Sequence, residues 1–428
     1  MEIFKRYRDY LQTLKDQEGL YEVNGEHRSL LSIEYTDGVR TAVKATDESS
    51  LYARAGNTNL GSALSQCLTE SPEELLATAI SMCTDSSVSI SVKYQSYQNS
   101  YEAVQHLGSA QELEEQLKMI DKELLFDGKT LNLQEVVETR WVCNQHGLAR
   151  QFSRKRLELD VDFLGLHWNC SASAAALDLT NLKIDMEDQR QNQLPLGHCS
   201  SGVYPAVLSN FAFTKFWVTG WHLFSGLAQQ NGASAFGGKI CERIASTQLS
   251  LFDVAEDDDT GYAYPFDCEG SNGEAVPLIQ HGVLTSALHS MSTGESTGNA
   301  GRTLGLVKGN AISVTPKNFL FDCGAFSTKE LLAKLDDGLY IFDVFDEFHG
   351  INVASGQFSF PCRAVRIVNG EKTELLEGLT INGHISDLLH AVQAVGDHRC
   401  YMPLLMHQCW QVGAPAILVS KIQVTGNE

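Results

Sequence analysis

One apolar segment, Phe211 to Leu227, constrains the fold of this chain more than any other stretch. Four aromatic residues fall on one side of it at helical spacing: Phe213, Trp217, Trp221 and Phe224. This spacing predicts an amphipathic helix that buries its aromatic side. The segment is short for a membrane span, and Lys215 interrupts it. We therefore expect a helix inside a large core and no membrane association.

Length and charge limit the classes of protein that the sequence can encode. The 428 residues suffice for two or three domains with a sizeable core. The formal net charge of −21 argues against a protein that binds the backbone of nucleic acids. The basic segment Arg150 to Arg156 is interpreted as a solvated strand end. We expect no nucleic-acid partner.

Cysteine usage and the N-terminus predict a cytoplasmic location. The 11 cysteines are scattered and form no Cys-x-x-Cys pair, which is typical of reduced thiols. Residues 1 to 17 have the apolar spacing of an amphipathic helix and lack the continuous apolar core of a signal peptide.

The order of the predicted elements indicates an α+β fold. Capping boxes begin helices at Ser71, Ser109 and Ser327, and Thr36-Asp37-Gly38 predicts a hairpin. We also expect a strand over 157–166, helices over 172–186 and 385–395, and strands over 339–344, 357–368 and 417–424. A polar linker at 187–193 divides a mixed α/β N-terminal domain, 1–193, from a larger β-rich C-terminal domain with a few helices, 194–428.

Phe211 to Ser246 resembles a segment of the TldD/PmbA (TldD/TldE) family, whose members were first named modulators of DNA gyrase. The catalytic members carry His-Glu-x-x-x-His followed by Gly-x-Ser-x-Phe-x-Gly, and Gly232 to Gly238 fits the second part. Counting back without a gap aligns His222 with the second metal-binding His. Trp217 then stands at the first His, and Val218 stands at the general-base Glu. Neither side chain can bind zinc or accept a proton from a metal-bound water.

The resemblance runs from about Gly202 to Gly426, while the first half fits only in the order of its elements. Phe266 to Gly270 is similar to the family's Phe-Asp-x-Glu-Gly turn, and Ser296 to Arg302 is similar to its Ser-Thr-Gly-Asn-Ala-x-Arg. The family implies an α/β domain joined to a β-rich domain. It also implies a complex of a zinc-bearing peptidase with a non-catalytic subunit, acting on unfolded or leader peptides. This sequence resembles the non-catalytic type, PmbA or TldE.

The resemblance also suggests candidate site residues. The third zinc ligand of the family is a Cys whose expected place is Tyr401, next to Cys400. A rebuilt site around His222 and Cys400, completed by His398 or water, is therefore an alternative, although a vestigial site without zinc is the main expectation. The candidate peptide-binding residues are Ser296, Thr297, Gly298, Asn299 and Arg302.

Other catalytic motifs have weaker support. Gly294 to Gly298 satisfies the Gly-x-Ser-x-Gly pattern of a serine hydrolase, which requires a strand before it and a helix after it. Cys268 lies between two acidic residues, which disfavour its thiolate. The acidic turn Glu256 to Gly261 lacks the alternating ligands of a calcium loop.

The sequence thus predicts a non-catalytic subunit of a cytoplasmic peptide-processing complex, paired with a TldD-like catalytic homologue and holding peptide. Two alternatives remain open: an active metallopeptidase with a rebuilt site, and a homodimeric peptide-binding protein.

Overall fold

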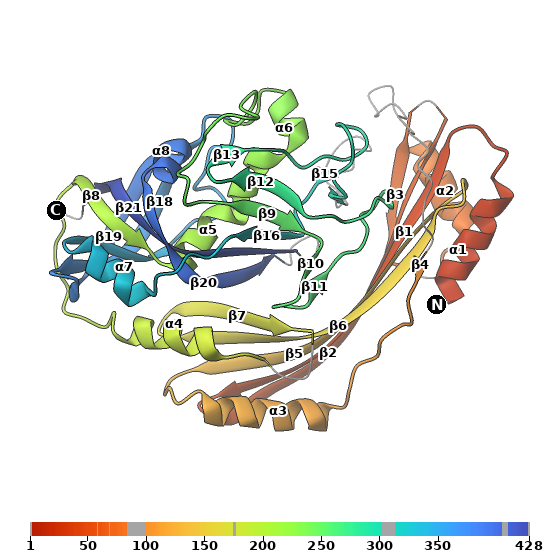
Figure 1. Cartoon of the computed structure of the whole chain (residues 1–428). Helices are drawn as coiled ribbons and strands as arrows, with labels where there is room; N and C mark the ends of the chain where they lie inside the picture. The colour runs from red at the N-terminus through yellow and green to blue at the C-terminus, as the bar shows by residue number, and fades with distance from the viewer. Residues whose placement is uncertain are drawn as a thin grey trace.

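The computed structural model describes residues 2–57, 59–67, 69–83, 100–173, 177–301, 313–404 and 410–426. The α+β prediction is confirmed: one extended β-sheet joins two regions, and helices pack on its faces (Figure 1). Alternating residues predict a further strand over 88–92, and both this segment and the candidate residue Arg302 lie outside the described residues.

The first region is a long antiparallel sheet. Its strands pair in the order β3 (Gly61–Ser65), β2 (Val39–Gly56), β1 (Leu20–Thr36), β5 (Thr130–Asn144), β6 (Ala149–Phe163) and β7 (Leu166–Ala172), and β4 (Ser100–Tyr101) adds in parallel to β6. The predicted hairpin turn is confirmed, because Asp37 and Gly38 both have positive φ. The prediction of a separate strand at 157–166 is wrong. These residues continue β6, and the chain turns only at Leu164 and Gly165.

Helices cover one face of this sheet. The helices α1 (Glu2–Thr13) and α2 (Pro72–Ser81) cover one end, and α3 (Ala110–Glu123) and α4 (Thr180–Arg190) cover the other. The capping boxes at Ser71 and Ser109 are both formed. The boundaries predicted for the helix over 172–186 are wrong. The strand β7 continues to Ala172, and α4 extends to Arg190, into the segment predicted as a linker. Strand pairing with β6 determines the conformation up to Ala172, and this pairing is not visible in the local sequence.

The opposite face of the sheet carries buried charges. Arg54 donates two hydrogen bonds to Glu22, its direct partner in the β1–β2 register. Arg156 contacts Glu138 and Glu158, and all three side chains are almost completely buried. The interpretation of 150–156 as a solvated strand end is therefore wrong. These residues lie inside β6, and neighbouring carboxylates neutralise much of their charge.

The second region contains a closed ring of strands. Pairing runs from β8 (Gly202–Leu208) through β17 (Gly338–Val344), β18 (Gln357–Val368), β19 (Glu371–His384) and β21 (Trp410–Thr425) back to β8. The predicted strand 357–368 has the same bounds as β18, and the strand predicted at 417–424 is part of the longer β21. Alternate residues of these strands fill a large apolar core beside α5 (Asn210–Gly220).

Further elements extend this region. The strands β16 (Asn318–Phe321), β9 (Leu251–Val254), β12 (Val276–Gln280) and β13 (Val283–Leu284) continue the sheet from β21. Two small antiparallel strand pairs, β10 (Glu256–Asp257) with β11 (Tyr262–Ala263) and β14 (Ala300–Gly301) with β15 (Ser313–Val314), lie apart from it. The remaining elements are η1 (Trp221–Phe224), α6 (Gly226–Gln230), α7 (Thr328–Leu335), α8 (Ile385–His390) and β20 (Val392–Leu404). The helix predicted over 385–395 is therefore too long, because residues from Val392 pair with β21.

The two regions meet through strand pairing, apolar packing and polar contacts of α4. Tyr401 of β20 pairs with Asn169 of β7, and aromatic residues of the second region pack on the charged face of the long sheet. Figure 1 shows the second region lying over the concave side of that sheet. The domain boundary at 193/194 stays a prediction. None of the helices in the described part of the chain has the length and apolarity needed to cross a membrane.

Candidate functional site

The helix α5 occupies the position that the sequence assigned to a zinc-binding helix. Ser209 caps it by accepting a hydrogen bond from the Ala212 amide at 3.0 Å. Trp217 is completely buried, and its ring centroid lies 4.8 Å from that of Phe321 and 5.8 Å from that of Phe213. Val218 is also buried. The two side chains at the ligand and general-base positions thus belong to the hydrophobic core.

His222 and Cys400 lie in very different surroundings. His222 is exposed in η1, where its Nδ1 lies 2.9 Å from the Thr219 carbonyl and its ring stacks on Trp221. Cys400 is buried in β20 within an apolar cluster, and burial raises the pKa of its thiol well above the ordinary value. Because successive strand residues point to opposite faces, Cys400 and Tyr401 project to different sides of β20.

His398 does not complete a metal site with these residues. Its Nε2 lies 2.9 Å from Asp185 of α4, and its Nδ1 lies 2.7 Å from Asp397. Burial opposes protonation of this ring, but the two carboxylates outweigh it and raise the pKa of His398 to about 9. A protonated imidazole has no lone pair for a metal. Within the described ranges, no group of three or more His, Cys, Asp or Glu side chains could hold a metal ion, so these residues do not fit the family's zinc site.

The segment Gly294 to Gly298 does not form a nucleophile elbow. The preceding strand is β13, which ends ten residues upstream at Leu284, and the next described element after the segment is the strand β14, not a helix. The Ser296 hydroxyl accepts a hydrogen bond from the Gly298 amide at 3.2 Å, as in a local turn. Gly298 has φ +72°, and a Cβ at this position would meet the Asn272 carbonyl oxygen at 2.1 Å. The glycine is required here by close backbone approach.

The candidate peptide-binding residues divide into surface and interior positions. Ser296 and Thr297 are half-buried. Thr297 is tied to His289, whose amide donates to the Thr297 hydroxyl at 2.8 Å. Asn299 is completely buried and donates from Nδ2 to the carboxylate of Asp253 and to the Thr315 carbonyl. The part of this segment that a peptide could reach is therefore Ser296 and Thr297.

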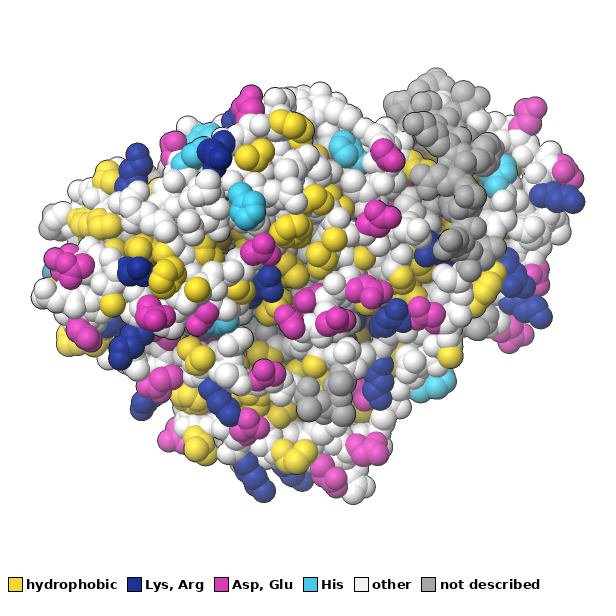
Figure 2. Space-filling view, in the orientation of Figure 1, with side chains coloured by type: hydrophobic (Ala, Val, Ile, Leu, Met, Phe, Trp, Pro, Cys, Tyr) yellow, Lys and Arg dark blue, Asp and Glu magenta, His cyan; other side chains and the backbone are white. Residues whose placement is uncertain are grey.

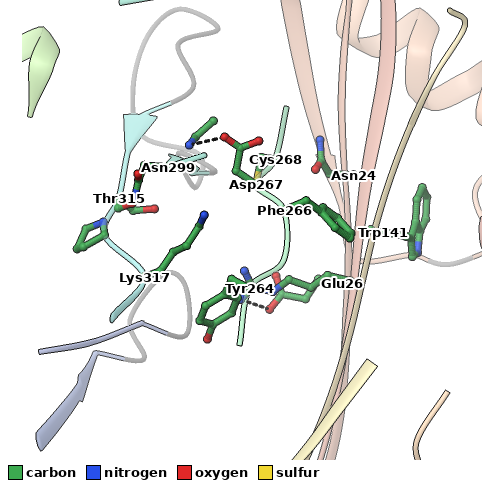
Figure 3. Close-up of a pocket in the computed structure, with 14 residues that line it drawn as sticks. Asn24, Glu26, Trp141, Tyr264, Phe266, Asp267, Cys268, Asn299, Thr315 and Lys317 are labelled. Atoms are coloured by element: carbon green, nitrogen blue, oxygen red, sulfur yellow. Dashed lines mark hydrogen bonds and ion pairs between the residues drawn. The ribbon is translucent and has the colours of Figure 1, made fainter. Parts of the chain in front are cut away.

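A small cavity lies where this segment meets the long sheet (Figure 3). Its volume is about 40 Å³, enough for a water molecule and too small for a peptide side chain. Asn24 and Glu26 contribute from the long sheet, and Asp267, Asn299 and Lys317 contribute from the second region. The two segments that resemble motifs of the family, the Phe-Asp-x-Glu-Gly turn and the Ser-Thr-Gly-Asn segment, thus meet at one buried polar junction.

Charged groups dominate this junction. Burial and the nearby Glu269 carboxylate raise the pKa of Asp267 to about 7, against the opposing effect of Lys317. Asp267 nevertheless accepts hydrogen bonds from the amides of Glu269, Ser271 and Ala300. Burial lowers the pKa of Lys317, whose Nζ makes no hydrogen bond to the described residues. The Asp267 carboxylate thus ties together the turn and the segment that bear the two motifs.

Lys317 and Asp253 were not identified from the sequence. Asp253 accepts hydrogen bonds from the Lys317 amide at 2.7 Å and from Asn299. Its carboxyl is buried, which raises its pKa to about 6. The only local signal was the polar run Thr315 to Asn318 between two apolar stretches. The acidic turn Glu256 to Gly261 is likewise held by hydrogen bonds within the protein. Its Asp257 carboxylate accepts a hydrogen bond from Thr260 at 2.6 Å and one from Gln411 at 2.8 Å.

Comparison with solved structures finds proteins with the same fold. The chain has the fold of TldE from Thermococcus kodakarensis, with a TM-score of 0.74 at 17% identity over 99% of this chain and 100% of that chain. A candidate modulator of DNA gyrase from Thermotoga maritima gives a TM-score of 0.75 at 21% identity over 99% and 100%. At these identities the likeness establishes the fold alone.

Sequence comparison identifies the family. Residues 201–426 match the PmbA/TldA metallopeptidase C-terminal domain. A metalloprotease of Methanocaldococcus jannaschii is 29% identical over 223 residues, which is 50% of this chain and 48% of that protein. A metalloprotease of Archaeoglobus fulgidus is 31% identical over 170 residues, 38% of each chain. The match therefore spans about half or less of the length of these relatives. The chain belongs to the TldD/PmbA metallopeptidase family.

Proposed function

We propose that this chain is a non-catalytic subunit of a TldD/TldE-like peptide-processing complex. It would hold unfolded or leader peptides while a zinc-bearing homologue cleaves them in the cytoplasm. One observation carries this proposal: Trp217 and Val218 fill the core at the positions of the family's zinc ligand and general base. A peptidase built on α5 would have to remove both from that core before it could bind zinc or ionise water.

The surface charge is consistent with a peptide ligand and not with nucleic acid. On the face shown in Figure 2, Lys and Arg side chains are interspersed with Asp and Glu and form no continuous basic area. The arginines of β6 contact carboxylates or carbonyl oxygens. For peptide contact we propose the Ser296–Thr297 surface, and we propose no zinc or other cofactor for this subunit.

The rebuilt metallopeptidase is the weaker alternative. Zinc binds the thiolate form of cysteine, whereas the Cys400 thiol is buried among apolar side chains with a raised pKa. Only the Nε2 atom of His222 is free to bind a metal, because Nδ1 contacts the Thr219 carbonyl. A single imidazole on the surface gives weak binding without catalysis.

Reconstitution with a catalytic homologue tests the proposal. The chain is co-expressed with a family member that carries an intact His-Glu-x-x-x-His motif, and cleavage of an unfolded peptide is measured for each chain alone and for both. We expect co-purification and full cleavage only with both chains. Replacing the partner's motif Glu by Gln should abolish cleavage, while His222→Ala in this chain should leave it unchanged. Cleavage by this chain alone, lost on chelation, would contradict the proposal.

A further inference from the structure

Two cysteines face each other where the long sheet meets the second region. Tyr401 of β20 pairs antiparallel with Asn169 of β7, and the two strands lie side by side in Figure 1. In an antiparallel pair the residue numbers rise along one strand as they fall along the other, so the next pair in this register is Cys400 with Cys170. Directly opposite residues project from the same face of the sheet. The two thiols therefore lie together, although they are far apart in the chain.

The spacing of this pair suits a disulfide. Directly opposite residues of antiparallel strands have Cα atoms about 4.5–5.5 Å apart and Cβ atoms at about the same separation. A disulfide joins Cα atoms about 4.4–6.8 Å apart and Cβ atoms about 3.5–4.5 Å apart. The Cα atoms thus already have the required separation, and the Cβ atoms need only a small approach. In the strand pairings of the described residues, no other two cysteines stand opposite each other or one step beyond a paired residue.

The surroundings of the two thiols keep them protonated at neutral pH. Cys400 is buried, whereas Cys170 keeps part of its surface exposed. Burial and the Asp185 carboxylate of α4 raise the pKa of Cys170 to about 12, and the same two causes raise the pKa of Cys400 well above its ordinary value. Asp160 of β6 adds to the effect on Cys170, and Lys215 of α5 opposes the effect on Cys400. Because the thiolate is the attacking species, the pair stays reduced until an oxidant is supplied.

We propose that Cys170 and Cys400 form a reversible disulfide that joins the long sheet covalently to the second region. The oxidant is a small disulfide, for example oxidised glutathione. The Cys170 sulfur, which is the more accessible, loses its proton and attacks one glutathione sulfur, so that the glutathione S–S bond breaks and one glutathione thiolate leaves. Cys400 then loses its proton and attacks the Cys170 sulfur, which releases the second glutathione. Two protein thiols are oxidised to one disulfide, and the two protons pass to the two glutathione thiolates.

A disulfide fits this pair better than a metal ion does. In the part of the chain that the structure describes, no third His, Cys, Asp or Glu completes a metal-binding group with the two thiols. The bond would tie β7 to β20, which pair across the two regions, and it would restrict the movement of one region relative to the other. The inference does not depend on the proposed function, because neither cysteine belongs to α5 or to the Ser296–Thr297 surface.

Oxidation of the full-length chain tests the proposal. The reduced protein is incubated with oxidised glutathione until Cys67 is fully modified. This thiol is exposed, and its hydrogen bond with Thr69 lowers its pKa, so that it reports the activity of the reagent. The remaining thiols are blocked under denaturing conditions, and the peptides are mapped by mass without reduction. We expect Cys170 joined to Cys400 within one chain, reversibly by dithiothreitol. Cys143, which is buried and has no cysteine opposite it, should stay a free thiol.

Thermal denaturation gives a second measurement. Closing so long a loop should raise the thermal midpoint of the oxidised chain by about 5 °C above that of the reduced chain. Cys170→Ala and Cys400→Ala should each abolish this difference, whereas the matched control Cys67→Ala should keep it. The proposal is overturned if Cys170 and Cys400 stay free, or carry only glutathione, once Cys67 has been consumed. It is also overturned if oxidation leaves the thermal midpoint unchanged, or if the difference persists in Cys400→Ala.

Discussion

Replacing Trp217 by His would restore the family's first metal ligand at that position, and we expect the protein to lose stability without gaining zinc. Trp217 is fully buried against Phe213, Phe224, Phe319 and Phe321. Loss of a buried aromatic side chain of this size costs about 3–5 kcal/mol. The indole nitrogen of Trp217 makes no hydrogen bond to the described residues, so its surroundings offer no partner for an imidazole. The imidazole introduced at this position would be a buried polar group without a hydrogen-bond partner, which costs about 1–3 kcal/mol. This cost offsets the stability that the imidazole regains by filling part of the space left by the indole.

The assay is urea denaturation followed by far-ultraviolet circular dichroism, which does not depend on tryptophan fluorescence. The midpoint should fall strongly for Trp217→His and Trp217→Ala. It should fall much less for Trp217→Phe, the matched control that keeps an aromatic ring. A Trp217→His variant that denatures at the wild-type urea concentration and binds zinc stoichiometrically would refute the reasoning. Such a result would mean that this position still faces a metal site.

Three further outcomes are expected. The pKa of His398 is raised to about 9 in the folded state, so protonation of this ring stabilises the fold by at most about 3 kcal/mol. This contribution is complete below about pH 6.5 and is lost as the pH rises through about 9. In denaturation series, His398→Gln should therefore cost the most stability at about pH 6 and the least at about pH 10. Gly298→Ala should lower the thermal midpoint more than Gly232→Ala, because both glycines have positive φ but only the first Cβ would meet backbone, at Asn272. His222→Ala should leave the thermal midpoint and partner binding unchanged, since its ring is exposed.

Much of the fold was predictable because local signals agreed with it. The Ser71, Ser109 and Ser327 capping boxes all form, and the strand predicted at 357–368 has those bounds in the structure. The errors occur where pairing with a distant strand decides the conformation. Residues from Val392 read as a continuing helix, yet they pair with β21, which begins at Trp410.

The site was predictable only in part. The sequence assigns Trp217 and Val218 to two positions of the family's motif, because the two halves of that motif are adjacent along the chain, and the structure shows that both side chains are buried. It did not predict that Asp253, Asn299 and Lys317 meet at one buried junction. These residues come from separate segments, and each of them alone reads as an ordinary surface residue. The same limit explains why the basic run in β6 was interpreted as solvated, although Arg156 is paired inside the protein.

The account depends most on the absence of a working zinc site in this chain, and metal analysis tests that claim directly. The protein is purified without nickel affinity, dialysed, and its zinc content is measured together with its cleavage of an unfolded peptide. We predict far less than one zinc per chain, with no cleavage in the absence of a catalytic partner. One zinc per chain, removed by a chelator together with peptidase activity of the isolated chain, would contradict the account.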